Sequence, residues 1–177
     1  MRLKFKSRFK TVKPLLPVIT ILLFALVYLI VPQVTVLIVF TLIAGTIQYF
    51  LALSKSPVDI NPTFFFMILL AVKYGWAYSA VFVFLATVIP VMIAGGELGI
   101  YAFIFMGSFL TLAFLSTLFS GYSIVLIGIA TVLINLFVAF WINISTDNPG
   151  GFVYSIIHAS ITIFYFVAVG EFLVNLI

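Results

Sequence analysis

This sequence contains one histidine, four scattered carboxylates and no cysteine. Few of its side chains could therefore bind a metal or act as an acid or base. A metal site needs several His, Cys or carboxylate ligands at matched spacing, and thiol chemistry needs a cysteine. His158 has no G-x-S-x-G partner for serine hydrolysis, and the chain contains neither a P-loop nor a Rossmann glycine fingerprint. We therefore expect a protein that is not an enzyme and that has no metal and no cofactor.

The stretch from residue 56 to residue 99 is expected to supply most of the polar groups of any binding site. Lys73, Tyr74 and Trp76 interrupt its apolar run. Lys73 either extends its ammonium group to the membrane interface or binds an anionic group in a cavity. The two aromatic rings either belong to an interfacial belt or stack on a planar ligand.

Two acids of the same stretch have two interpretations each. Asp59 precedes Asn61 and Pro62, and its carboxylate either caps local backbone in a solvated loop or contacts a ligand. Glu97 lies in a glycine-rich break, where it is either solvated or reaches the interior of the helical bundle.

Asn135 and Asn143 are eight residues apart, which places them near one face of a helix. Buried asparagines of this kind bridge helices or bind a ligand. His158 lies in the last apolar run, close to Ser155 and Thr162, and is either a hydrogen-bonded structural residue or a ligand contact. The candidate ligand-binding residues are thus Lys73, Tyr74, Trp76, Glu97, Asn135 and His158.

The elements that position these residues are apolar helices in a lipid bilayer. Of the 177 residues, 66% are hydrophobic and 7% are charged, whereas an ordinary globular domain has about 25% charged residues. The apolar runs are uninterrupted and do not alternate with period two, so helices are the expected spanning elements.

The chain is expected to be an all-α, polytopic membrane bundle of six to seven transmembrane helices. Spanning helices are predicted at residues 15–31, 34–53, 77–93, 100–119, 122–144 and 152–177. The run from Thr63 to Val72 is too short to cross about 30 Å of hydrocarbon alone. It predicts a short or re-entrant helix, with Asn61 as its N-cap, or a span extended by its flanks. Six spans would place the C-terminus inside, and seven would place it outside.

A basic tail, residues 1–14, precedes the single transmembrane domain, residues 15–177. Six of the eight Lys and Arg residues lie in this tail, so it is expected on the cytoplasmic side, next to anionic lipid. Basic and aromatic residues also interleave in nucleic-acid-binding segments, but their position beside a span favours lipid. The compact loops are typical of a prokaryotic cytoplasmic membrane.

Three segments resemble known membrane proteins: an Asn-Pro that opens a short apolar helix (61–66), a small-residue break before a span (94–100), and Asn143-Ile144-Ser145 before a final helix. The pattern is similar to the rod-shape-determining MreD family and, more remotely, to the substrate-binding S components of energy-coupling-factor vitamin transporters. Both resemblances imply a compact bundle of about six helices.

Two functions follow as hypotheses. The first is a small-molecule binding or transport component that resembles an S component. The second is a membrane scaffold or assembly subunit of the MreD type, whose small residues Gly45, Gly107 and Gly128 would pack against partner membrane subunits.

Overall fold

The computed structural model describes residues 20, 29, 31–54, 59–96 and 98–177. It divides the chain into two units, Met1–Val36 and Leu37–Ile177, and each is described by itself. The predicted basic tail, nearly all of the predicted first span and the candidate residue Glu97 lie outside the described residues.

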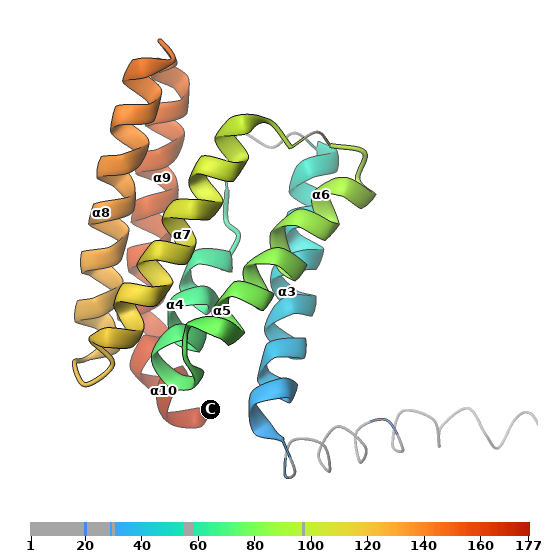
Figure 1. Ribbon diagram of the computed structural model, residues 1–177, viewed down its shortest axis with the longest axis vertical. Coiled ribbons are helices and arrows are strands. Elements are labelled where there is room, and N and C mark those ends of the chain that lie inside the picture. The colour runs from blue at the N-terminus through green and yellow to red at the C-terminus, as the bar shows by residue number, and fades with distance from the viewer. Residues whose placement is uncertain (1–19, 21–28, 30, 55–58, 97) are drawn as a thin grey trace, which may run out of the picture. The chain divides into compact units, whose positions relative to one another are not determined.

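All regular structure in the described part is helical, and it forms six continuous helical segments (Figure 1). They are α3 (Pro32–Ser54), α4 (Thr63–Tyr74), α5 (Trp76–Val83) continued by the π-helical η1 (Phe84–Val88) and α6 (Ile89–Ile93), α7 (Ile100–Leu118), α8 (Ile124–Ser145), and α9 (Pro149–Tyr165) continued by the π-helical η2 (Phe166–Gly170) and α10 (Glu171–Leu176). The all-α prediction is confirmed for these residues.

Four of these segments are long and apolar enough to cross a membrane, which makes the chain an integral membrane protein. They are Pro32–Ser54, Trp76–Ile93, Ile124–Ser145 and Pro149–Leu176. Two apolar helices are shorter: α4, and the Ala102–Leu118 part of α7. The predicted total of six to seven spans is confirmed only for these four among the described residues. Large apolar side chains such as Phe137, Phe164 and Phe172 are exposed on the outer faces, where lipid would cover them.

The short helix α4 is the centre of the second unit. Its residues from Thr63 to Ala71 are all buried, because α5, α7, α8 and α9 pack around it. A helix that is apolar on every side belongs in such a position. With 12 residues it is about 18 Å long, so the prediction of a short helix is confirmed.

The α4 helix begins at the predicted residue and ends at Tyr74, two residues after the predicted end. The side-chain oxygen of Asn61 accepts hydrogen bonds from the Thr63 amide at 3.1 Å and from the Thr63 hydroxyl at 2.8 Å. Asn61 therefore caps the Thr63 amide, but the N-cap position itself is Pro62, one residue later than predicted. At the other end, Gly75 adopts φ +93°, a conformation that side chains with a Cβ rarely reach. The chain turns there and returns as α5.

One buried hydrogen bond joins this pair of helices. The Ser79 hydroxyl of α5 donates to the Met67 carbonyl of α4 at 2.8 Å, and Ser79 is fully buried. We expect Ser79→Ala to lower the free energy of unfolding by about 1 kcal/mol, since one interhelical hydrogen bond is lost. Thermal unfolding in detergent would measure this. Ser160→Ala is the matched control, because that exposed hydroxyl bonds only within its own helix. Equal losses in the two variants would contradict the prediction.

The spanning segment Trp76–Ile93 departs from α geometry near Pro90, which has no amide to donate to the helix. The π-helical turn η1 lies directly before α6, and Pro90 is the second residue of α6. A π-turn widens the helix locally and re-aims the side chains that it contains. Thr87, which belongs to η1, lies on the wall of the cavity described next.

Candidate functional site

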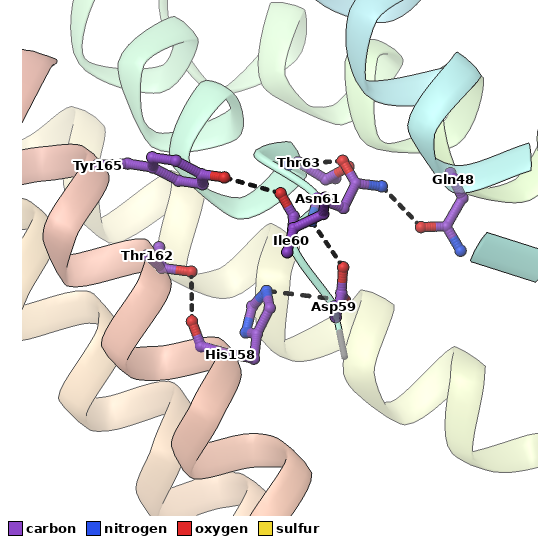
Figure 2. A network of polar contacts seen from close by, with 8 residues as sticks. All are labelled: Gln48, Asp59, Ile60, Asn61, Thr63, His158, Thr162 and Tyr165. Atoms are coloured by element: carbon purple, nitrogen blue, oxygen red, sulfur yellow. Dashed lines mark hydrogen bonds and ion pairs between the residues drawn. The ribbon is translucent and has the colours of Figure 1, made fainter. Parts of the chain in front are cut away.

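The loop that leads into α4 carries a connected set of polar contacts (Figure 2). A carboxylate oxygen of Asp59 accepts a hydrogen bond from the Asn61 amide at 2.8 Å. The Asn61 side-chain amide donates to Oε1 of Gln48 in α3 at 2.7 Å. Asn61 therefore holds the loop, α3 and the first turn of α4 together, and it is 3% exposed.

Helix α9 meets this loop from the other side (Figure 2). The Tyr165 hydroxyl donates to the Ile60 carbonyl at 2.9 Å. His158 lies about two turns earlier on the same helix face, with Nε2 3.9 Å from Oδ2 of Asp59. That distance is too long for a direct hydrogen bond, so the two groups form a loose pair whose side chains are only 15% and 20% exposed.

A cavity of about 370 Å³ opens beside this pair. Helix α9 contributes Gly151, Tyr154, Ser155, His158, Ala159 and Thr162, whose spacing of three and four residues defines one helix face. Helix α8 contributes Asn135, Leu136, Ala139 and Asn143 with the same period, and α7 contributes Phe105, Met106 and Phe109. Thr63 and Phe64 of the first turn of α4 line the cavity, together with Asn61 of the preceding loop.

Two polar atoms on this wall have no hydrogen-bond partner among the described residues. They are the Asn135 Oδ1 and the Thr87 Oγ1, and both residues line the cavity. Buried polar atoms are nearly always paired, because an unpaired one costs about 1–3 kcal/mol. The cavity therefore offers hydrogen-bonding capacity that water or a bound molecule would use.

The structure brings together only part of the candidate set. Asn135 and His158 line the cavity, and so does Asn143 from the same face of α8, as its eight-residue spacing predicts. Glu97 lies outside the described residues.

Lys73, Tyr74 and Trp76 do not line this cavity, and their expected grouping with Asn135 and His158 is not observed. The ammonium group of Lys73 donates to the Val174 carbonyl at 3.0 Å, and the Tyr74 hydroxyl donates to the Ile177 carbonyl at 2.7 Å. Trp76 is half exposed. The reason is the direction of α4: its first turn faces the cavity, and Lys73 is about 14 Å further along the axis.

Several cavity residues are absent from the candidate set, chiefly Asp59, Asn61, Gln48 and Tyr154. The loop pattern in the sequence shows the capping role of Asp59 and Asn61, and the structure adds that both also reach the cavity. Tyr154 has a sequence signal, since residues 151, 154, 155, 158 and 162 follow a helical period. Gln48 has a signal as a polar residue inside the predicted span 34–53, but the sequence does not show its partner, because Asn61 is thirteen residues away across a loop.

The described residues hold no group of three His, Cys, Asp or Glu side chains that would bind a metal ion. No family model matches the chain, and no curated protein or solved structure matches it. The interpretation of the cavity therefore depends on its own residues.

Proposed function

We propose that this chain is a membrane component that binds or transports a small molecule, similar in role to an S component. The observation that carries the proposal is the polar-lined cavity of about 370 Å³ inside an otherwise apolar bundle. Ligand sites in proteins typically measure about 300–1,000 Å³ and combine apolar walls with a few convergent polar groups. The cavity meets both conditions.

Polar groups inside a membrane bundle are costly and tend to mark function. Asp59, His158 and Asn135 come from three separate segments, yet they line one space. Asn135 makes no side-chain hydrogen bond through Oδ1 in the described residues, so interhelical bridging by that oxygen does not account for it. A bound molecule that pairs with these groups would account for the arrangement.

The alternative is a scaffold subunit that uses Gly45, Gly107 and Gly128 as contact faces. Gly128 instead packs under the Phe166 ring, and Gly45 approaches the Pro90 side chain. A Cβ added at Gly107 would meet open space, so only one of the three positions is available to a partner subunit. This distribution supports the binding hypothesis over the scaffold.

The protein acts without catalysis in a prokaryotic cytoplasmic membrane, with the basic tail against anionic lipid on the cytoplasmic side. Its partners are the bilayer, the small-molecule ligand and further membrane subunits, with no nucleic acid.

Asn135→Leu is the test of the cavity. Leucine has a similar volume but offers no hydrogen bond, so we expect binding of the co-purified molecule to weaken by about tenfold or more. The folded state should persist, because a buried unpaired polar group is removed. Native mass spectrometry of the full chain from mild detergent would measure occupancy, with Phe137→Leu on the outer face of the same helix as the control.

Two results would contradict the proposal. One is a wild-type chain that carries no small molecule and shows no thermal shift with any compound of a broad metabolite panel. The other is an Asn135→Leu variant that retains full occupancy of the bound molecule.

A further inference from the structure

The charges on the cavity wall are unbalanced. Asp59 is the one acid among the lining residues that the structure describes, His158 is the one histidine, and this wall contains neither Lys nor Arg. With a neutral imidazole, the wall has one negative charge. Charges in such surroundings are weakly screened, so an unbalanced carboxylate favours a ligand that brings the opposite charge.

The Asp59 carboxylate retains capacity to accept hydrogen bonds. One oxygen accepts from the Asn61 amide at 2.8 Å. The other lies 3.9 Å from Nε2 of His158, beyond hydrogen-bonding distance. An ionised carboxylate accepts about four hydrogen bonds. The Tyr154 hydroxyl is a further hydrogen-bond donor to this carboxylate. The loop contact and Tyr154 position the group, and its remaining lone pairs are available to the cavity.

Other atoms on the cavity wall also favour a ligand that carries hydrogen-bond donors. The Asn135 Oδ1 is an acceptor, the Thr87 hydroxyl oxygen can accept, and neither has a partner in the described part of the chain. Together with Asp59 they present three acceptors to one space. A protonated primary amine has three N–H donors, as the lysine ammonium group does, so its hydrogen-bonding capacity matches this set.

The remaining wall is apolar and aromatic. Phe64, Phe105, Met106 and Phe109 line it, and Tyr154 adds a further ring. Such side chains bury a compact apolar body, and aromatic faces attract a nearby cation. The volume of about 370 Å³ restricts the ligand to a small molecule.

We propose that the cavity selects a small organic cation, a protonated amine attached to a compact apolar or aromatic body. The amine pairs with Asp59 and donates to Asn135 and Thr87, while the body packs against Phe64, Phe105 and Phe109. This inference rests on the proposed function and names the ligand class of the same site.

Three probes that share one body and differ in charge test this selection. Tryptamine is cationic, N-acetyltryptamine is neutral and indole-3-acetate is anionic. The full chain would be placed in phosphatidylcholine nanodiscs, and equilibrium dialysis against empty nanodiscs would correct for partition into lipid. We expect tryptamine to bind about tenfold or more tightly than either other probe, because a charge-assisted hydrogen bond contributes more than a neutral one.

The variant Asp59→Asn keeps the shape and removes the charge. We expect it to weaken tryptamine binding by about ten- to hundredfold and to leave N-acetyltryptamine binding within about twofold. Glu171→Gln is the matched control, since it also neutralises one acid. Glu171 lies in α10, away from the cavity wall, and accepts a hydrogen bond from Ser123.

The outcomes separate the two proposals. The cation selectivity would be overturned if the neutral or the anionic probe bound more tightly, or if tryptamine binding survived Asp59→Asn. The proposed function as a small-molecule binding component would still stand in either case. Absence of binding by all three probes, together with no bound molecule in native mass spectrometry, would overturn the ligand class and the proposed function alike.

Discussion

Replacement of Gly128 by leucine should prevent normal packing of α8 against η2. A Cβ placed at Gly128 would overlap the ring of Phe166. That ring is fully buried and packs edge-to-face on Phe65 with 4.9 Å between ring centroids, so it has little room to move. We expect Gly128→Leu to lower the free energy of unfolding by about 3 kcal/mol, because overpacking exceeds the gain in helix propensity.

The measurement is thermal unfolding in detergent, followed by size-exclusion chromatography of the heated sample. Gly107→Leu is the control, because a Cβ there meets nothing within 4 Å. A second variant identifies the cause: Gly128→Leu combined with Phe166→Ala should lose less stability than the sum of the two single losses, since the removed ring makes space. Additive losses, or a Gly128→Leu variant as stable as wild type, would refute the close contact.

Replacement of Asn61 by leucine should destabilise the whole loop before α4. The change removes the hydrogen bond to Gln48 and leaves the amide and the hydroxyl of Thr63 without their acceptor. Thr63 is buried at the cavity wall, so only water inside the cavity could replace the lost partner. We expect the free energy of unfolding to fall by about 3 kcal/mol, from one lost helix cap and the unpaired polar groups.

Asn61→Asp separates the contribution of the bonds that Asn61 accepts from Thr63 from the contribution of the bond that it donates to Gln48. It keeps an acceptor for Thr63 but loses the donor to Gln48 and places a second carboxylate close to Asp59, so its stability should lie between wild type and Asn61→Leu. Asn175→Leu, at an exposed position of α10, is the control in the same thermal assay. If Asn61→Leu unfolded at the same temperature as that control, the network in Figure 2 would not contribute to stability.

The Gly128–Phe166 contact and the Asn61 hydrogen bonds both position residues of the cavity wall. Gly128 and Phe166 fix the distance between α8 and the helix that contains His158. Asn61 fixes the loop that presents Asp59. Because His158 and Asp59 meet across the cavity wall, changes at either point should alter the site as well as the fold.

The helices of this protein could be read from its sequence with small boundary errors. The apolar run predicted at residues 122–144 is α8 (Ile124–Ser145), and the short run predicted at 63–72 is α4 (Thr63–Tyr74). Long apolar runs have one stable conformation in lipid, since the backbone must satisfy its own hydrogen bonds. The cap by Asn61 and the turn at Gly75 are likewise local, because each depends on groups a few residues apart.

The membership of the site was decided by tertiary structure. Asn135 and His158 belong to it, and Asp59 and Gln48 join from elements distant in sequence. Lys73 and Tyr74 instead lie at the opposite end of α4, and Trp76 begins α5. Helix periodicity shows which residues share a face, but not which faces meet or which end of a helix a cavity occupies. Those depend on side-chain packing between segments, here on Phe166 seated over Gly128 and on Asn61 bound to Gln48.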